Sequence, residues 1–285
     1  MFKLVYSDLR DGFYNTAIDE AIFAKIKKGT AQNTITLTEW KPTVSIGYSQ
    51  RCEVDVDIQA CRRKNIDIVR RYSGGKSVYL DENYIVFSLA ASHNDAGKGY
   101  LHELRNRPCK SVIHVLNDNG IPAKFFPPDN IVIRKKGGGY MTLGNSGQKV
   151  TQRHFYVHGS IRYDLPEYSF LNLIDTLKIN GESLHEHKED ARNVLAAVTD
   201  HSDMPKEALA EEIAESLAKE FGGHVESRSH LTREEEQDIL LIRNEISSHM
   251  WLQDRPGYKW RGICYFFLNG NNLLPQMRYK KNPPS

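Results

Sequence analysis

The sequence predicts an α+β fold in which helices flank a mixed β-sheet. Three observations support it: strand-like segments dominate the first two thirds of the chain, amphipathic helices dominate the last third, and no repeat or long linker separates them. Apolar residues make up 40% of the 285 residues and charged residues 26%, as is typical of a globular protein. We expect one domain over residues 1–250 and a short tail, 251–285, that packs on it.

Charge and cysteine content argue against several classes of protein. The 38 basic and 36 acidic residues give a net charge of +2, which disfavours a general nucleic-acid binder. The N-terminus does not read as a signal peptide and no run of about 18 apolar residues occurs, so we expect a cytoplasmic protein without a membrane partner. The four cysteines lack CxxC spacing, which predicts reduced, buried thiols rather than disulfides or a zinc site.

A helix is expected to open the fold. Isoleucines recur every four residues from Ile18 to Ile26, which places them on one face. Asn15 is a suitable N-cap, and Asp19 and Glu20 would then lie in the first turn, where the helix dipole favours negative charge.

Strands and turns follow. Alternating or β-branched residues predict strands at 34–40, 43–48, 66–70, 84–90, 131–133 and 154–163. A helix is predicted at 109–117, ending before Gly120 and Pro122. Residues 134–139 form an expected basic, flexible loop, and 140–143 an extended segment that ends in a glycine turn at 144–147.

Two amphipathic helices are expected in the last third. Leu209, Ile213 and Leu217 recur every four residues within 206–221. Thr232 and Glu235 have the spacing of a capping box, which predicts a second helix with its isoleucines turned inward.

The segment 70–77, Arg-Arg-Tyr-Ser-Gly-Gly-Lys-Ser, is the first candidate site. Its glycines would let backbone N–H groups approach a ligand closely, and its cations favour an anion or acyl carboxylate. The spacing fits neither a Walker A loop nor GxGxxG. A hairpin turn with solvated arginines is the alternative interpretation.

Several motifs, in this order, resemble those of the lipoate–protein ligase family, part of the biotin/lipoate ligase superfamily. Residues 15–20, Asn-Thr-Ala-Ile-Asp-Glu, look like that family's Asn-Leu-Ala-x-Glu-Glu. Further similar segments are 40–47 (Trp-x-Pro-x-Val-Ser-Ile-Gly), 70–75 (Arg-Arg-x-Ser-Gly-Gly), 130–132 (family Asn-Asp-Ile), 158–160 (His-Gly-Ser), 192–199 and 247–251. The resemblance runs through nearly the whole chain and implies a mostly antiparallel, ligase-like sheet.

The resemblance implies an enzyme that uses ATP and Mg²⁺ to activate lipoate as lipoyl-AMP. The acyl group would then pass to a lysine of a lipoyl domain or an H-protein-type acceptor. The roughly 35 residues after Trp251 are too few for the accessory domain of larger members, so a separate accessory subunit is an expected partner.

The resemblance also implies the residues of the site. Those expected to bind the acyl group and the adenylate are Arg70, Arg71, Ser73, Gly74, Gly75, Ser77, Asn130, Asn145, Ser146, Gly147, His158, Gly159 and Ser160. The apolar tail could lie against Val44, Ile46, Val78 and Val157, although for each of them singly we favour ordinary core packing. No protein metal ligands are expected: His185 and His187 look like part of a solvated loop.

Three positions depart from the family pattern. Lys76 stands where the third glycine is expected, and Leu80 where a histidine precedes Asp81. Thr142 occupies the position of a lysine that bridges the acyl carboxylate and the phosphate, and a threonine supplies no charge for a developing anion. We expect Lys76 to supply the charge instead; Lys149 is a weaker candidate.

Two other functions remain open. An octanoyl- or lipoyltransferase would move an acyl group between carrier proteins, but relatives of that kind use a cysteine just before the strand at 131–133, and residues 123–128 contain none. A non-catalytic relative would only bind carrier proteins, and the basic residues 134–136 would suit an acidic carrier surface.

Overall fold

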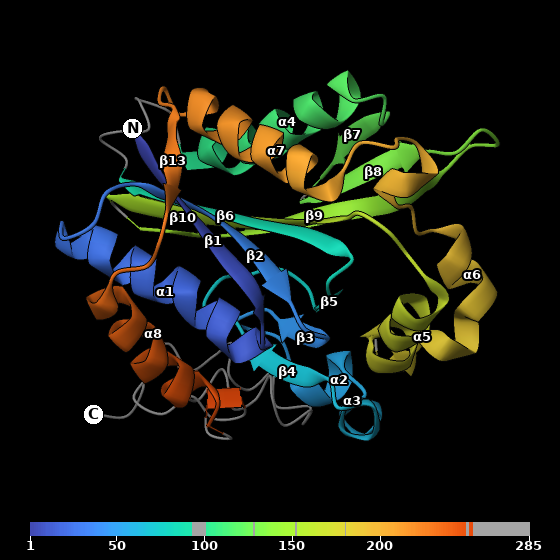
Figure 1. Cartoon of the computed structure of the whole chain (residues 1–285). Helices are drawn as coiled ribbons and strands as arrows, with labels where there is room; N and C mark the ends of the chain where they lie inside the picture. Colours follow the sequence, from blue (N-terminus) through green and yellow to red (C-terminus); the bar gives the residue numbers. More distant parts are fainter. Residues whose placement is uncertain (93–100, 128, 152, 180, 249–250, 253–285) are drawn as a thin grey trace, which may run out of the picture.

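The fold is built on one large sheet with helices on both faces. The computed structural model describes residues 1–92, 101–127, 129–151, 153–179, 181–248 and 251–252. Eight strands pair in the order β13-β1-β2-β6-β10-β9-β8-β7. In Figure 1, α1 and α8 lie below this sheet and α4 and α7 above it. The predicted α+β class is confirmed.

The large sheet is mixed and mostly antiparallel, as expected. Only the pairs β1–β13 and β1–β2 are parallel among its described strands. Its strands are β1 (Phe2–Arg10), β2 (Thr34–Trp40), β6 (Tyr84–Ser92), β7 (Ala123–Phe126), β8 (Asn130–Arg134), β9 (Tyr140–Val150), β10 (His154–Arg162) and β13 (Val225–Ser229). The covering helices are α1 (Gly12–Lys28), α4 (Leu101–Asp118), α7 (Lys206–Glu220) and α8 (Arg233–Ile246).

A smaller unit packs beside the large sheet. Its three strands pair in the order β4-β3-β5. Its elements are β3 (Thr43–Ile46), α2 (Cys52–Asp55), α3 (Ile58–Lys64), β4 (Asp67–Arg70), β5 (Val78–Leu80), α5 (Glu167–Thr176), β11 (Lys178–Ile179), β12 (Glu182–Ser183) and α6 (Lys188–Asn193), with a 3₁₀ turn at Leu184–His187. A second 3₁₀ turn, Val198–Asp200, packs with the large sheet through Val198.

Three apolar clusters hold these layers together. One lies between the large sheet and α4 with α7, where Leu209, Ile213 and Leu217 are buried as their spacing predicts. The second surrounds the small sheet and includes Phe170 of α5. The third joins α1 to α8 through residues such as Ile18. None of the helices within the described ranges is both long enough and apolar enough to cross a membrane.

The first helix begins earlier than predicted. Asp11, not Asn15, is its N-cap, and the Asp11 side chain accepts a hydrogen bond from the backbone N–H of Tyr14 at 2.8 Å. Asn15 is buried one turn into the helix and donates its amide to the carbonyl of Glu39. Asp19 is therefore not in the first turn but faces the sheet.

The predicted glycine turn at 144–147 is wrong. These residues continue β9, which pairs with β10 from Gly144 opposite Ile161 to Gly147 opposite His158. A Cβ at Gly144 would lie 2.4 Å from the carbonyl oxygen of Ser160, so this glycine permits a close approach of two strands. The capping box at Thr232 and Glu235 is confirmed as the start of α8.

Candidate active site

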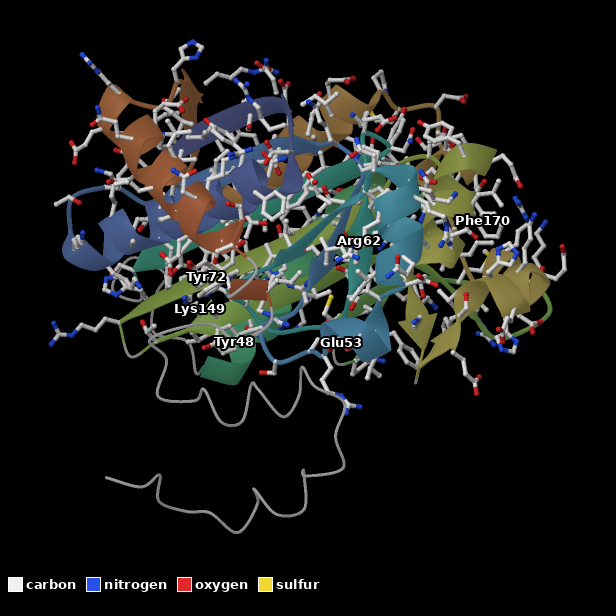
Figure 2. All side chains as sticks on the ribbon, turned by 90° about the horizontal axis from the view of Figure 1, so that it is seen from below. Tyr48, Glu53, Arg62, Tyr72, Lys149 and Phe170 are labelled. Atoms are coloured by element: carbon white, nitrogen blue, oxygen red, sulfur yellow. The ribbon has the colours of Figure 1, made fainter. Side chains whose placement is uncertain are left out.

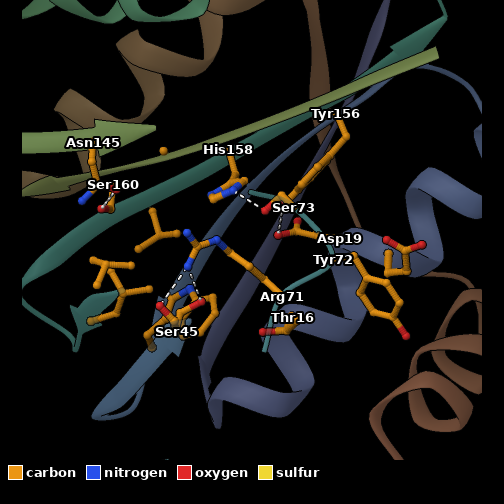
Figure 3. Close-up of a pocket in the computed structure, with 16 residues that line it drawn as sticks. Thr16, Asp19, Ser45, Arg71, Tyr72, Ser73, Asn145, Tyr156, His158 and Ser160 are labelled. Atoms are coloured by element: carbon orange, nitrogen blue, oxygen red, sulfur yellow. Dashed lines mark hydrogen bonds between the residues drawn. The ribbon is translucent and has the colours of Figure 1, made fainter. Parts of the chain in front are cut away.

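Two adjoining cavities lie where α1, the large sheet and the small sheet meet. The inner cavity, about 40 Å³, is lined by residues of α1, β6, β10 and the glycine loop 71–77 (Figure 3). The outer cavity, about 840 Å³, extends from there toward β8, β9 and α6. Arg71, Val78, Asn145 and Ser160 line both cavities, so the two communicate.

The glycine loop folds around the side chain of Arg71. The Arg71 guanidinium donates to the carbonyl and hydroxyl of Ser45 and to the carbonyls of Gly74 and Lys76, at 2.8–3.4 Å. Burial lowers the pKa of Arg71 to about 10, so it remains charged near neutral pH. Gly75 has φ = +98°, a conformation that favours glycine. Arg71 thus fixes the loop and places a positive charge between the two cavities.

Arg70, although adjacent in sequence, has a different role. Its side chain is fully buried and lines neither cavity. It donates to the backbone carbonyls of Gly47, Tyr48, Gln50 and Leu252, the last near the end of the described chain. Arg70 therefore organises backbone segments around the loop rather than contacting a ligand.

Ser73 and His158 line the inner cavity and do not line the outer one. The Ser73 Oγ and His158 Nε2 atoms are 2.7 Å apart. Burial and the charge of Arg71 lower the pKa of His158 to about 3, so the imidazole is neutral near pH 7. A Cβ at Gly147 would lie 2.5 Å from His158 Nε2 and 3.0 Å from the Gly74 carbonyl oxygen. Gly147 therefore allows this imidazole and the glycine loop to come together.

Asp19 contributes a buried carboxyl group that we did not predict for the site. It accepts hydrogen bonds from the hydroxyls of Tyr156, Ser88 and Thr36 at 2.6, 2.7 and 3.2 Å. Burial raises the pKa of Asp19 to about 6 against the effect of these hydrogen bonds. Tyr156 alternates with His158 along β10, and this period of two places both in the inner cavity.

The outer cavity is basic. Of its charged lining residues five are cations and two are carboxylates, namely Arg51, Arg71, Lys76, Arg162 and Lys178 against Asp55 and Asp129. The pKa of Asp129 is raised, because the effect of burial outweighs the opposing effect of the positive charges of Lys76 and Arg71. Such a lining fits an anionic group.

Thr142 and Lys76 line the same outer cavity. Thr142 lies in β9, where its carbonyl accepts from Arg162 at 2.8 Å and its N–H donates to the carbonyl of Val194 at 2.7 Å. Lys76 is exposed, and its side chain belongs to the loop that Arg71 fixes. Lys76 is therefore available to the cavity that Thr142 lines.

Lys149 lies outside both cavity linings. Its ammonium is 3.1 Å from a carboxylate oxygen of Glu20 and 5.0 Å from the ring centre of Tyr72, beside which Figure 2 shows it. The ion pair engages the charge of Lys149 with Glu20 of α1, which lines the inner cavity.

The remaining predicted binding residues are divided between the two cavities. Ser73, His158 and Gly159 line the inner cavity only, and Ser77, Asn130 and Ser146 the outer cavity only. Gly74, Gly75 and Gly147 line neither but shape the loop and its contacts.

The predicted apolar lining is only partly found. Val78 lines both cavities, whereas Val44, Ile46 and Val157 are buried in the apolar clusters. Trp40, Leu80 and Val86 provide apolar surface in their place. Strand alternation alone does not tell which of two packed faces a valine joins, because both faces are apolar here.

The three described cysteines are buried and reduced. Burial raises the pKa of both Cys52 and Cys61 to about 12. Cys109 Sγ lies 3.0 Å from Ser146 Oγ, and burial raises its pKa too. No described cysteine is among the lining residues of either cavity, and Cys264 lies outside the described residues.

No group of three or more potential ligands for a metal ion occurs within the part of the chain that the structure describes. His185 lies in a 3₁₀ turn and is 2.6 Å from a carboxylate oxygen of Asp175. It therefore belongs to an exposed hydrogen-bonded pair.

Sequence reasoning overlooked several residues that line the cavities. These are Thr16 and Asp19, whose motif was noted without a role, together with Arg51, Asp129, Tyr156, Arg162 and Lys178. The period-two pattern of β10 could have identified Tyr156. The others reach the site through tertiary packing.

Comparison with known proteins places this geometry in a family. Residues 11–222 match the model of the lipoyl protein ligase A/B catalytic domain. The octanoyltransferase LipM of Kyrpidia tusciae is 28% identical over 88% of this chain and 97% of that protein. The octanoyltransferase LipM of Clostridioides difficile is 39% identical, but over 31% of this chain and only about a third of that protein (32%).

Solved structures share the fold at low sequence identity. A lipoate-protein ligase A bound with ATP is 18% identical, with a TM-score of 0.73 and coverage of 88% of this chain and 98% of that one. A bipartite lipoate protein ligase from Thermoplasma acidophilum is 19% identical, with a TM-score of 0.72 and coverage of 87% and 96%. Both similarities concern the fold of the chain.

Proposed function

The chain belongs to the family of lipoyl protein ligase A/B catalytic domains, and from that premise we propose that it transfers an octanoyl- or lipoyl-type acyl group to a lysine of a lipoyl-domain carrier protein. The acyl group would arrive already activated, as a thioester on another carrier. The relatives named octanoyltransferase support this choice over the activation of free lipoate.

The observation that carries the proposal is the threonine at position 142. Thr142 lines the outer cavity where the family pattern has lysine. Formation of an acyl adenylate places negative charge on both the carboxylate and the phosphate, and a charged donor between them stabilises that arrangement. A thioester carbonyl is uncharged until it is attacked, so this step makes less demand on position 142.

The transfer itself needs no cysteine. The amine of the acceptor lysine attacks the thioester carbonyl, a C–N bond forms, the C–S bond breaks, and the donor thiol leaves with the proton that the amine loses. The described cysteines lie outside the cavity linings, which favours this direct route over a covalent enzyme intermediate. Lys76 and Arg71, both in the glycine loop, are the cations that would stabilise the oxyanion formed at the thioester carbonyl.

The basic outer cavity fits the phosphate-bearing arm of an acyl carrier. Five cations and two carboxylates line it. The same lining also fits the phosphates of ATP, but it lacks the lysine at position 142 that would bridge the acyl carboxylate and the phosphate. The acceptor lysine of a lipoyl domain or H-protein-type protein would reach the acyl group through this cavity. By analogy with the bipartite ligase, a separate accessory subunit remains part of the proposal.

A comparison of acyl donors tests the proposal. Purified protein and a lipoyl domain are incubated with an octanoyl-thioester carrier without ATP, and in parallel with free octanoate or lipoate, ATP and Mg²⁺. Mass spectrometry of the intact acceptor is expected to reveal acylation in the first mixture. Acylation in the second mixture alone contradicts the proposal, and acylation in neither, with or without an accessory subunit, favours a non-catalytic carrier-binding protein.

The second candidate is the ATP-dependent lipoate–protein ligase. One observation favours it: Lys76 lines the same cavity as Thr142 and could supply the charge that Thr142 lacks. In that case lipoyl-AMP would form in the second mixture and Lys76→Ala would abolish its formation.

A further inference from the structure

The outer cavity contains a buried arginine that is bonded only to neutral groups within the part of the chain that the structure describes. Arg162 of β10 is 6% exposed and lines this cavity. Its guanidinium donates to the hydroxyl of Tyr84 and to the carbonyls of Thr142 and Ala196, at 2.8–3.1 Å, and pairs with no described carboxylate. A buried cation without an opposite charge destabilises a protein, and an anion that binds beside it relieves this cost.

One amino group of Arg162 is open to the cavity. The three hydrogen bonds use its Nε and Nη1 atoms and leave Nη2 without an acceptor among the described residues. Nη2 does not belong to the unpartnered side-chain atoms that are sealed from solvent. Because Arg162 lines the outer cavity, this amino group can donate to a ligand there.

Arg162 lies close to the place where the two cavities meet. Ser160, which lines both cavities, is two residues earlier on β10, so the two side chains share a face of the strand and their Cα atoms are about 7 Å apart. In the proposed transfer the glycine loop, with Lys76 and Arg71, stabilises the oxyanion at this junction. Arg162 reaches the junction from β10 instead, and therefore adds a second positive charge from another element.

We propose that Arg162 stabilises the thiolate that leaves in the acyl transfer. When the C–S bond breaks, its electron pair goes to the sulfur, and the guanidinium stabilises this charge until the sulfur takes the proton that the amine loses. A phosphate at the far end of a carrier arm is a poorer partner, because the arm separates it from the thioester, whereas Arg162 lies at the junction. The inference rests on the proposed function and adds a catalytic residue to it.

Thioesters that differ only in the leaving thiol test the proposal. Octanoyl N-acetylcysteamine releases an alkyl thiol, and an octanoyl aryl thioester releases a more acidic thiol, which needs less stabilisation. With a lipoyl domain as acceptor, and after subtraction of the uncatalysed reaction, Arg162→Gln should lower kcat/KM about 100-fold for the alkyl donor and less than about 10-fold for the aryl donor. Arg162→Lys, which keeps a positive charge, should restore the ratio of the two values toward that of the wild type.

The matched control is the same substitution at an exposed arginine. Arg228 pairs with Glu211 and lines neither of the two cavities, so Arg228→Gln should leave both kcat/KM values unchanged. A partly unfolded sample lowers the rates with both donors equally and leaves their ratio unchanged. An Arg162→Gln protein whose two values fall by the same factor therefore overturns the inference and leaves the proposed transfer standing.

The wild type alone gives a second measurement, which needs no variant to fold. Across a series of octanoyl thioesters, its kcat/KM should depend less steeply on the pKa of the leaving thiol than does the uncatalysed reaction of the same thioesters with a lysine amine. An equally steep dependence overturns the inference alone. Acylation of the lipoyl domain by none of the donors contradicts the proposed transfer and the inference together.

Discussion

Burial sets the protonation states of single residues in the inner cavity. The pKa of His158 is lowered to about 3 and the pKa of Asp19 is raised to about 6. Both shifts favour the neutral form of the side chain. With a pKa of about 6, Asp19 is still mostly ionised near neutral pH, where Arg71, with a pKa of about 10, is protonated; the inner cavity therefore holds a carboxylate and a guanidinium of opposite charge.

The His158 shift predicts a pH-dependent loss of stability. The unfolded chain, with an ordinary histidine pKa near 6.5, binds a proton before the folded protein does, so stability falls as the pH drops below 6.5 toward 3. Asp19 acts in the opposite direction: its contribution is present at low pH and lost as the pH rises through about 6. The variant His158→Gln keeps the contribution of Asp19 to the pH dependence of stability and removes that of His158.

Urea unfolding of the wild type and of His158→Gln between pH 7 and pH 4.5 checks this prediction. The free energy of unfolding of the wild type, relative to His158→Gln, should decrease with falling pH, at most by about 1.4 kcal/mol per pH unit. A difference that stays constant over this range would show that His158 titrates normally in the folded protein.

Lys76 is the residue on which catalysis should depend. Lys76→Ala removes the exposed cation of the glycine loop and should lower the rate of acceptor acylation about 100-fold, the size of an oxyanion-stabilising contact. Lys149→Ala is the matched control, since the Lys149 side chain itself lines neither cavity, although its partner Glu20 lines the inner one; its rate should change less than about threefold. Equal losses in both variants would contradict the assignment of the charge to Lys76.

Among the elements, β9 and β10 bring the site together by close packing. Gly147→Ala adds a methyl group against the His158 ring and the Gly74 carbonyl, and should lower the free energy of unfolding by about 1–3 kcal/mol and reduce acylation. Gly137→Ala serves as the control, because a Cβ there meets nothing within 4 Å. Thermal unfolding and the acylation rate check both; an unaffected Gly147→Ala protein would refute this packing.

The start of α8 offers a prediction of stability alone. Thr232 Oγ1 accepts from the N–H of Glu235 and the Glu235 carboxylate accepts from the N–H of Thr232. Thr232→Ala should reduce the free energy of unfolding by about 1 kcal/mol, as measured in urea. Ser247→Ala, at the exposed C-terminal end of the same helix, should have a smaller effect.

Elements with a local signal could be predicted from the sequence, and those defined by tertiary contacts could not. The strand at 34–40 and the capping box of α8 depend on alternation and spacing, and both are found. The segment 144–147 was mistaken for a turn because glycine marks both turns and close strand approaches. The true start of α1 was missed because the nearer Asn15 is also a favourable cap.

The site was predictable as a set of motifs but not as a geometry. Arg70 and Arg71 are adjacent and chemically identical, yet only Arg71 lines the cavities. The Arg70 guanidinium is engaged instead by backbone carbonyls, among them that of the distant Leu252. No local pattern links residues so far apart in the sequence.

At the scale of the whole molecule, the end of the described chain supports the glycine loop. Trp251 is buried, donates its indole N–H to the carbonyl of Arg70 at 2.9 Å, and packs against Tyr72 with tilted rings whose centres are 4.3 Å apart. Of the expected tail, 251–285, only residues 251–252 are described, so its packing on the domain stays a prediction.

Trp251 should accordingly affect both stability and activity. Trp251→Ala should lower the free energy of unfolding by about 3–5 kcal/mol, and Trp251→Phe, which keeps a ring but loses the N–H donor, by about 1 kcal/mol. Urea unfolding measures both. If Trp251→Phe unfolds with the free energy of the wild type, the hydrogen bond to Arg70 does not support the loop.

The most direct measurement of the central claim is the exchange of labelled pyrophosphate into ATP in the presence of octanoate or lipoate, which reports adenylate formation alone. With Thr142 in the cavity and a preactivated donor as the substrate, we predict no exchange above that of a mixture without the protein. Exchange that depends on the acyl acid and is lost in Lys76→Ala would contradict this account and establish an ATP-dependent ligase.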